Sequence, residues 1–259
     1  MIIADVHCHL DHQSFDGQID KLIENAKKAG VKAIITNGVN PESNRKALKI
    51  AKKYDIVLPA LGIYPIDALQ RETGTDSYGS GNGFDVDKEI GFIRQNKDKI
   101  AAIGEVGMDL KLGKDVNSQR EVFGKMLRLA DELDKPILIH SRKAEKEVMD
   151  ILARTKHKKI VMHCFSGKKK YVIEGLKRGY YFSIPTNIVR SFQFQLLVEI
   201  APMSQLLTET DAPYLSPYQG KTNEPAFITE TIKQIAEIKK MDKEEVSKIL
   251  FMNYQKLFA

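Results

Sequence analysis

The stretch Asp5-Val6-His7-Cys8-His9, close to the start of the chain, is predicted to lie on a β-strand. Side chains on a strand alternate between its two faces, so His7 and His9 should project from the same face as Asp5, with Val6 and Cys8 on the other. The two imidazoles would then stand about 6–7 Å apart along the strand. One divalent cation can lie between them, because a zinc–nitrogen bond is about 2.0–2.1 Å long. Two buried histidines with ordinary hydrogen-bond partners are the alternative interpretation.

Short apolar segments alternate with amphipathic segments of helix length along the chain. This order is typical of a parallel sheet whose strands are joined by helices. The predicted strands cover residues 2–7, 32–37, 56–63, 100–105, 136–140, 159–163, 180–184 and 206–211. The chain has 259 residues, and barrels of eight strands and eight helices average about 250. We therefore predict an α/β fold, a (β/α)8 TIM barrel with an extra C-terminal helix, as a single hydrolase domain over residues 1–259.

Local sequence signals mark the starts of several helices. Asn40 is followed by proline, a residue favoured in the first helical turn, and is predicted to be a helix cap. Ser118, with a glutamate three residues later, is predicted to form a capping box, and Asp242 to cap the last helix. Residues 72–85 are glycine-rich and poor in apolar side chains, which predicts a loop before a helix over residues 86–95.

The composition is that of an ordinary soluble globular protein, with 42% hydrophobic and 29% charged residues. We expect no membrane span and no secretory signal, because no sufficiently long apolar run is present. Cys8 and Cys164 do not make a disulfide framework, which favours the reducing cytoplasm. The net charge of +6 is compatible with a polyanionic partner, although lysine runs such as residues 168–170 are more often a solvated surface.

Six side chains that can bind metal fall at the carboxyl ends of the predicted strands, where barrels of this kind carry their chemistry. They are His7 and His9 from the first strand, Glu105 from the fourth, His140 from the fifth, His163 from the sixth and Asp211 from the eighth. Each has a structural interpretation if taken alone: a carboxylate can pair with a buried arginine or cap a segment, and a histidine can be a hydrogen-bonded core residue. Together these interpretations require six unrelated coincidences on one face of the barrel.

Two metal ions account for this number of donors. One catalytic zinc takes about three protein ligands, so six donors indicate a pair of ions, about 3.5–4 Å apart, that share one carboxylate. Glu105 is the expected bridge. We expect His7, His9, Glu105 and Asp211 around one ion, and Glu105, His140 and His163 around the other. Asp5 and Glu209 lie one step deeper on their strands, and we expect them to fix imidazole tautomers.

Water held by such ions loses its proton near neutral pH and becomes a nucleophile. Asp211 is the expected general base, so that Asp211 and Glu105 are the predicted catalytic residues. The reaction class is hydrolysis of an ester, an amide or a phosphoester. Histidine-rich sites suit Zn²⁺, Mn²⁺ or Fe, whereas Mg²⁺ prefers oxygen ligands and water, so the residues leave the metal's identity open.

An ordered set of motifs runs through nearly the whole chain: Asp5-Val6-His7-Cys8-His9-Leu10, Gly104-Glu105-Val106-Gly107-Met108-Asp109, His140-Ser141-Arg142, His163-Cys164-Phe165-Ser166-Gly167, Glu209-Thr210-Asp211-Ala212-Pro213-Tyr214-Leu215 and Asn223-Glu224-Pro225. Each motif is weak alone, but the ordered set resembles the TatD family of metal-dependent deoxyribonucleases, within the amidohydrolase-like barrels. The resemblance implies hydrolysis of DNA phosphodiester bonds, from single-stranded or 3′ ends, with divalent metal. It also implies the ligand roles assigned above.

The sequence departs from the family pattern at three positions that are not metal ligands. Tyr64 replaces the histidine of the usual Gly-x-His-Pro motif, Leu110 replaces an aromatic residue, and Thr222 replaces an arginine. Tyr64 can still stack on a base or donate a hydrogen bond to a phosphate. Arg142 is the predicted phosphate contact, because a guanidinium forks onto phosphate oxygens; a structural ion pair is its alternative. Asn223, in the Asn-Glu-Pro motif, is the third residue expected to contact substrate.

Two other functions remain open at this point. The same barrel could serve as an amidohydrolase or lactonase, or as a deacylase of aminoacyl-tRNA, although such barrels often bridge their metals with a carboxylated lysine on the fourth strand, where this chain has Glu105. A barrel that retains metal could also be a non-catalytic binding module. DNA is the expected partner, as substrate, with no membrane and no obligate protein partner.

Overall fold

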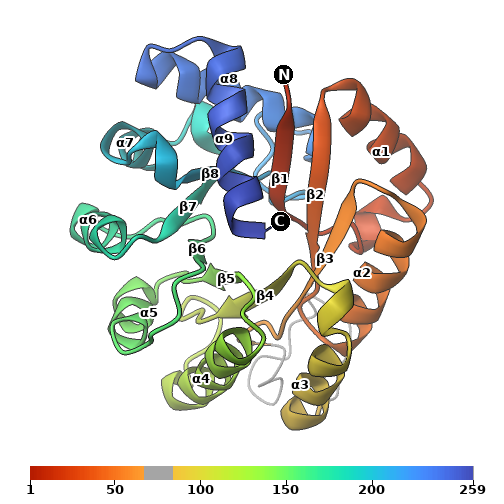
Figure 1. The fold of residues 1–259 in the computed structure, drawn as a ribbon, viewed down its shortest axis with the longest axis vertical. Helices are drawn as coiled ribbons and strands as arrows, with labels where there is room; N and C mark the ends of the chain where they lie inside the picture. The colour runs from red at the N-terminus through yellow and green to blue at the C-terminus, as the bar shows by residue number, and fades with distance from the viewer. Residues whose placement is uncertain (67–83, 259) are drawn as a thin grey trace.

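Eight parallel strands follow one another in sequence order around a central axis in this computed structural model, which describes residues 1–66 and 84–258 (Figure 1). The strands are β1 (Ile3–Cys8), β2 (Val31–Asn37), β3 (Val57–Leu61), β4 (Ala102–Gly107), β5 (Ile137–His140), β6 (Ile160–Met162), β7 (Tyr181–Ile184) and β8 (Leu206–Thr208). Every neighbouring pair from β1–β2 to β7–β8 is parallel. The predicted (β/α)8 barrel is confirmed.

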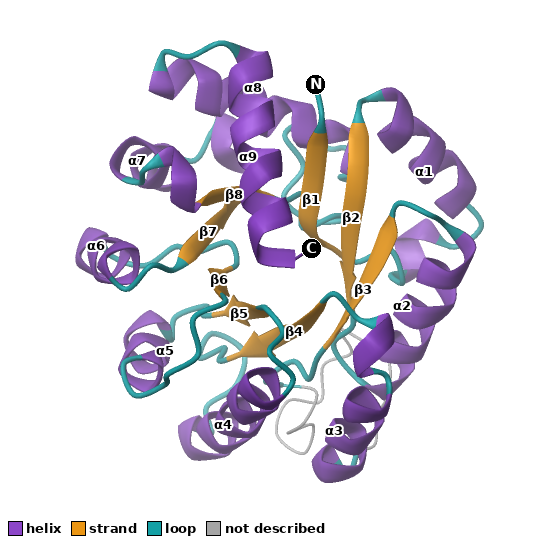
Figure 2. Cartoon of the chain, in the orientation of Figure 1, coloured by secondary structure: helices purple, strands orange, loops and turns teal. Residues whose placement is uncertain are grey.

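Helices connect the strands and form the outer layer, as Figure 2 shows. They are α1 (Ile19–Lys28), α2 (Pro41–Lys53), α3 (Val86–Gln95), α4 (Val116–Glu132), α5 (Glu145–Leu152), α6 (Lys169–Lys177), α7 (Phe192–Ile200), α8 (Ile228–Lys239) and α9 (Lys243–Phe258), with short 3₁₀ turns η1 (Gln13–Phe15), η3 (Lys97–Lys99), η4 (Thr186–Val189), η5 (Met203–Gln205) and η6 (Pro225–Phe227). The loop predicted over residues 72–85 lies almost wholly outside the described residues. Within the described ranges, every helix is too short or too polar to cross a lipid bilayer.

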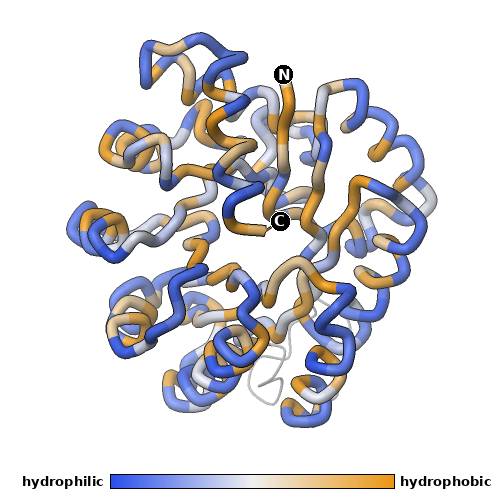
Figure 3. Tube along the Cα trace, in the orientation of Figure 1, coloured by the Kyte–Doolittle hydropathy of each residue, from blue (hydrophilic) through white to orange (hydrophobic). Residues whose placement is uncertain are grey.

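Two apolar cores lie on the two sides of the sheet. The larger packs the outer faces of the strands against the helices, as with Ile103 and Phe123. The smaller fills the barrel interior with small and branched side chains and includes Tyr254 and Leu257 of α9. Figure 3 shows the corresponding pattern along the chain, with mainly hydrophobic residues in the strands and alternating hydrophilic and hydrophobic residues in the helices. The extra C-terminal helix α9 therefore packs across the opening at the amino ends of the strands (Figure 1).

Strands β8 and β1 complete the ring without a regular ladder of backbone hydrogen bonds among the described residues. Instead, the Asp211 N–H donates to the His7 carbonyl and the His9 N–H donates to the Ala212 carbonyl, both at 2.8 Å. Asp5 accepts hydrogen bonds from the Thr210 N–H at 2.9 Å and from its hydroxyl at 2.5 Å. These contacts fix the segment after β8 directly beside the two histidines of β1.

The first strand does not alternate as predicted. Cys8 packs in the outer core but Val6 packs in the barrel interior. The pairing with β2 shifts register between Asp5 and Cys8, and such an irregularity re-aims the residues within it. The prediction that Val6 and Cys8 share a face is therefore wrong, although His7 and His9 do approach each other.

Two of the predicted helix caps are confirmed. The Asn40 side chain accepts a hydrogen bond from the Ser43 N–H at 3.0 Å, and proline occupies the first turn of α2. The Asp242 carboxylate accepts from the Glu245 N–H at 3.3 Å at the start of α9. Both caps satisfy backbone donors that a helix start leaves without an intrahelical partner.

The capping box predicted at Ser118 is wrong. Helix α4 begins at Val116, and Asp115 caps it by accepting from the Ser118 N–H at 3.0 Å. The earlier start places Gln119 in the first turn, where it is buried and holds the backbone of Asp109: it accepts from the Asp109 N–H at 2.7 Å and donates to the Asp109 carbonyl at 3.1 Å. The beginning of α4 thus fixes the loop that follows β4.

Candidate metal centre

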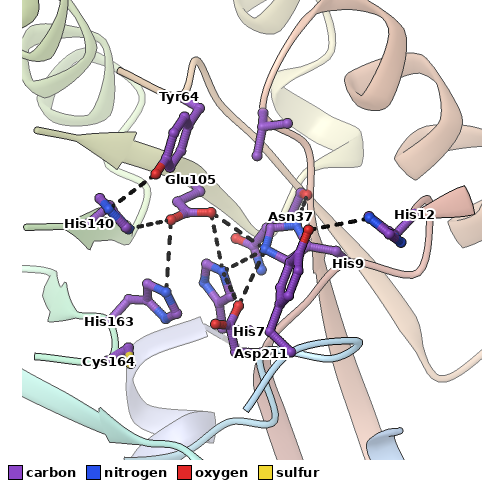
Figure 4. Close-up of polar contacts among 12 residues, drawn as sticks. His7, His9, His12, Asn37, Tyr64, Glu105, His140, His163, Cys164 and Asp211 are labelled. Carbon is purple, nitrogen blue, oxygen red and sulfur yellow. Dashed lines mark hydrogen bonds and ion pairs between the residues drawn. The ribbon is translucent and has the colours of Figure 1, made fainter. Parts of the chain in front are cut away.

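The Glu105 carboxylate lies amid four histidines near the carboxyl ends of the strands (Figure 4). Glu105 belongs to β4 and is buried. Its Oε2 lies 3.5 Å from Nε2 of His7 and 3.5 Å from Nε2 of His9. Its Oε1 lies 2.8 Å from Nδ1 of His140 and 3.8 Å from Nε2 of His163. Each carboxylate oxygen therefore faces a different pair of imidazoles.

Asp211 completes the group on the β1 side. The Nε2 atoms of His7 and His9 are 3.2 Å apart, and Oδ1 of Asp211 lies 3.7 Å from the first and 3.4 Å from the second. Strand β8 ends at Thr208, earlier than predicted, so Asp211 stands in the following loop with φ of 56°. Aspartate tolerates this left-handed conformation better than most residues. The backbone bond from Asp211 to His7 then holds its carboxylate beside β1.

The spacing of these donors fits a metal ion. With bonds of about 2.0–2.1 Å, donors at two corners of a tetrahedron stand about 3.3–3.4 Å apart. The two Nε2 atoms are 3.2 Å apart, and each lies 3.4–3.7 Å from the facing oxygens of Glu105 and Asp211. The donor atoms of His7, His9 and Asp211, and those of His7, Glu105 and His163, lie within 4.8 Å of one another. Imidazole nitrogen with carboxylate oxygen is also a donor set that divalent transition metals accept.

Three of the four imidazoles are held by a contact at their second ring nitrogen. Nδ1 of His163 lies 2.8 Å from Oε2 of Glu209, Nδ1 of His9 lies 3.0 Å from the Asn37 carbonyl, and Nε2 of His140 lies 3.1 Å from Oδ2 of Asp109. Such contacts fix a ring's orientation and tautomer and leave its other nitrogen for the metal. Here the other nitrogen of each ring faces Glu105.

Of the two acids expected to fix imidazoles, only Glu209 contacts one. Its second oxygen accepts from the Cys164 N–H at 3.0 Å, so its carboxylate is held in place as well. Asp5 instead contacts Thr210 and the backbone N–H of His7. The role predicted for Asp5 is therefore corrected, because the irregularity of β1 turns it toward the loop after β8 rather than toward an imidazole.

Burial and charge act against each other at these groups. Burial alone would raise the pKa of Glu105, but hydrogen bonds from His140 and His7 hold it well below its usual range. Burial lowers the pKa of His7 to about 4, with His163 adding to the effect. Burial also disfavours the charged form of His9, but Asp211 and Glu105 outweigh it and raise the pKa to about 9. The carboxylates thus favour the protonated form of His9 but not that of His7, where burial outweighs them.

A cavity of about 370 Å³ opens above this centre. Five of the six predicted ligands line it, namely His9, Glu105, His140, His163 and Asp211, and Tyr64 and Arg142 are part of the same wall. The remaining ligand, His7, lies beneath them with no exposed surface. The structure therefore brings together all six predicted ligands and two of the three predicted substrate contacts.

Asp109 links Tyr64 and Arg142 to His140. Its Oδ2 accepts from the Tyr64 hydroxyl at 2.6 Å and from Nε of Arg142 at 2.7 Å, in addition to contacting His140. Burial would raise the pKa of Asp109, but His140 and Arg142 hold it below its usual range. Arg142 thus makes the structural ion pair that was its alternative interpretation, while its side chain stays 39% exposed at the cavity.

Asn223 does not reach the cavity. Its side chain is fully buried and donates to the Thr186 hydroxyl at 2.9 Å and to the carbonyls of Thr210 and Tyr214, both at 2.7 Å. The structure thus corrects the expectation that Asn223 contacts substrate. It holds the loop that carries Asp211, because its amide joins the two ends of that loop to the segment after β7.

Sequence reasoning assigned no role to Asp109 or to three apolar lining residues, Leu112, Tyr214 and Leu215. Asp109, Tyr214 and Leu215 all stand inside the quoted motifs, so the motifs themselves were the available signal. Strand alternation could not find them, because all four residues lie in loops after β4 and β8.

Comparisons with known proteins agree with this geometry. The model of the family described as TatD related DNase matches residues 4–259. The human protein named deoxyribonuclease TATDN3 is 35% identical over 99% of this chain and 94% of its own length. An uncharacterized metal-dependent hydrolase of Methanocaldococcus jannaschii is 39% identical over 98% of this chain and 96% of its own. The crystal structure of YJJV, a TatD homologue of Escherichia coli, superposes with a TM-score of 0.86 at 26% identity, covering 99% of this chain and 97% of that one. The chain belongs to the TatD family of related DNases.

Proposed function

We propose that this protein is a divalent-metal-dependent hydrolase that cleaves DNA phosphodiester bonds. The observation that carries the proposal is the Glu105 carboxylate, whose two oxygens face two different pairs of histidines. Membership of the TatD family and the deoxyribonuclease name of the human relative support DNA as the substrate. The metal centre, the cavity and the family membership all support this one activity. We propose that a single domain over residues 1–259 carries it.

Two bound metal ions would engage all six donor residues. His7, His9, Glu105 and Asp211 would hold one ion, and Glu105, His140 and His163 the other. When bound, the ions would supply an activated water and neutralise the charge that develops on the phosphate. The donor set suits Zn²⁺, Mn²⁺ or Fe, with Mg²⁺ as the less favoured choice because of its preference for oxygen.

The chain's own residues supply proton transfer and orientation. His9 and neighbouring histidines hold the pKa of Asp211 below its usual range, although burial acts to raise it, so this carboxylate is ionised at neutral pH. An ionised carboxylate at the cavity wall can accept a proton from the attacking water, which makes Asp211 the general base. Glu209 holds His163, and Asp109 holds His140, so the rings that face the substrate are fixed before it arrives.

We further propose that the substrate is single-stranded DNA or a 3′ end, because a cavity of about 370 Å³ admits a strand end rather than a duplex. No protein partner is needed in this proposal, since the described chain supplies all six ligands. A cytoplasmic location is proposed from the two cysteines, which are free in the structure.

The two alternative functions are not favoured. A small-molecule amidohydrolase, a lactonase or an aminoacyl-tRNA deacylase would often bridge its ions with a carboxylated lysine, but β4 carries no lysine and presents Glu105 instead. A non-catalytic binding module does not require six convergent metal donors with an open cavity beside them.

We propose to test the three functions together by incubating the metal-loaded protein with labelled single-stranded DNA and with a panel of esters and lactones. Cleavage of DNA supports the proposal, whereas turnover of the panel with intact DNA, or no turnover at all, contradicts it.

Replacing Arg142 with alanine should weaken DNA binding about tenfold, the effect of losing one hydrogen bond to a charged group. The variant should also bind with a flatter dependence on salt, by about 0.7 in the slope for one lost phosphate contact. Metal content should stay the same, because Tyr64 and His140 still hold Asp109. Binding isotherms at several salt concentrations, with elemental analysis alongside, check this expectation. Loss of metal from the variant would show that Arg142 supports the centre instead.

Metal affinity should rise with pH. Burial disfavours the charged form of His163, but Glu209 and Asp211 outweigh it and raise the pKa to about 10, close to the value of about 9 for His9. Both rings carry a proton at neutral pH and must lose it to bind metal. Binding is therefore favoured as pH rises toward these values, by up to about tenfold per pH unit for each proton displaced. Calorimetric titrations in buffers of different ionisation enthalpy should count about two protons released at neutral pH; a count of zero contradicts the prediction.

A further inference from the structure

A second hollow, of about 310 Å³, lies between the loop after β6 and helix α7. Phe165, Gly167 and Lys168 form one wall with the first turn of α6, and Phe192 and Gln193 begin the other. The two walls are joined, because Nε2 of Gln193 donates to the carbonyls of Ser166 and Gly167. The hollow is therefore preformed rather than a gap between separate segments.

Phe192 is unusual for its exposure. Its side chain is 76% exposed, more than any other large hydrophobic residue among the described residues. A single exposed apolar side chain needs no explanation by itself. This one stands at the first position of α7 and lines a hollow whose opposite wall includes two exposed lysines, Lys168 and Lys169, with the exposed Lys170 next to them in the chain.

These lysines differ from several others in the described part of the chain by the lack of an ion pair. None of the three makes an ion pair there, whereas Lys125, Lys146 and Lys159 on other helices and loops each pair with an aspartate. Lys170 instead lies over the ring of Tyr171, with 4.7 Å between its Nζ and the ring centroid. An unpaired cluster of this kind beside an exposed aromatic ring is complementary to a polyanion that carries planar groups.

The hollow lies on the same side of the barrel as the candidate metal centre. His163 lines the first cavity, and the chain that leaves it forms the wall of the second from Phe165 onward. Lys168 is five positions after His163, a span of at most about 17 Å. The other wall is tied to the first cavity as well, because Arg190 donates to the carbonyls of Ser216 at 2.6 Å and Pro217 at 3.0 Å, directly after the lining residue Leu215.

We propose that this hollow binds the DNA strand a few nucleotides away from the bond that is cleaved, with one base stacked on Phe192 and the backbone phosphates on Lys168 and Lys169. The proposal rests on the function proposed above. The occupant is a single strand, because an exposed aromatic ring can stack on a base only where the base is not already stacked within a duplex. The lysines alone would bind either form.

Phe192→Ala is the test, measured by fluorescence anisotropy with a labelled single-stranded 12-mer and by the KM for its hydrolysis. We expect about tenfold weaker binding and a similar rise in KM, the loss that removal of one stacking residue produces. Phe192→Tyr should restore binding, because the ring is kept. Lys168→Gln with Lys169→Gln should flatten the salt dependence by about 1.4 in slope, at about 0.7 for each lost phosphate contact on a single strand. The effect of Phe192→Ala should be smaller for a dinucleotide, because it has only one nucleotide on each side of the cleaved bond and the proposed surface holds nucleotides further along the strand.

Met252→Ala is the matched control, because Met252 is 65% exposed on α9, at the opposite end of the barrel. If wild-type protein cleaves the 12-mer and Phe192→Ala binds it equally well, the proposed surface is wrong while the proposed function stands. If wild-type protein binds the 12-mer through Phe192 without cleaving it, the function fails and the surface stands. Equal loss of duplex and single-strand binding, or a change of oligomeric state in Phe192→Ala, overturns the proposal in favour of a general electrostatic surface or a contact between copies.

Discussion

Replacing Glu105 with glutamine should reduce bound metal to at most one ion per chain and lower DNA hydrolysis at least about 10³-fold. The substitution keeps the shape of the side chain but removes the negative charge that faces four imidazoles. A metal ion that polarises a reacting oxygen lowers the activation barrier by several kcal/mol, and a change of about 4 kcal/mol corresponds to a factor of about 10³ in rate. Elemental analysis of the purified variant and a cleavage assay on labelled single-stranded DNA measure the two effects.

Glu121→Gln provides the control for this substitution. Glu121 lies on α4 with 71% of its side chain exposed, and its ion pair with Lys125 is long, at 3.6 Å. Its replacement should leave metal content and cleavage as in the wild type, since exposed pairs of this kind contribute about 0–1 kcal/mol. If Glu105→Gln kept two ions and more than a tenth of the wild-type rate, Glu105 would not be the bridge.

Replacing Asp211 with asparagine should lower kcat by about 10²–10⁴-fold, the range for loss of a general base. Asparagine tolerates the left-handed backbone found at this position, with φ of 56°. The loop after β8 should therefore keep its form, and the lost rate reports on the carboxylate. The rate should not return when more metal is added, and its rise with pH near the pKa of the base should disappear. Steady-state kinetics across pH, with and without excess metal, measure both.

Asp134→Asn is a close match for this variant. Asp134 also has a left-handed backbone, with φ of 51°, but its side chain is 82% exposed in the turn before β5 and pairs with Lys159. A loss of stability caused by the change from aspartate to asparagine should appear in both variants. A loss of kcat caused by removal of a catalytic carboxylate should appear only in Asp211→Asn. Full recovery of the Asp211→Asn rate on addition of metal would mean that Asp211 acts only as a ligand and not also as the base.

The sequence sufficed for the fold and for the six donors because both follow from strand periodicity. Apolar runs of strand length set the positions of β1 to β8, and the carboxyl ends of parallel strands meet at one end of a barrel. His140 and His163 are 23 positions apart in sequence, yet both face the same oxygen of Glu105 for this reason. Strand β8 was predicted to end at residue 211 and ends at Thr208. This error of three residues still placed Asp211 at the correct end of the barrel.

The errors share a different cause, which is that loops and irregular strands have no period. Asp109 lies after β4 and was given no role, although it holds His140. Asn223 is identifiable as part of a motif, but only coordinates show that its amide binds carbonyl groups inside the loop. Both Asp115 and Ser118 are good helix caps, and sequence alone does not rank them; the earlier cap is used, and the helix so extended places Gln119 against Asp109.

Helix α9 has a practical consequence for handling the protein. The ammonium group of Met1 lies 3.0 Å from the Glu244 carboxylate, and the last turns of α9 pack on the interior core at the amino ends of the strands. An affinity tag or a linker to a solid support, joined at the amino end of β1, would therefore lie at the end of the barrel away from the proposed catalytic opening. Immobilised protein should keep that opening turned toward the solution and accessible to long polymers.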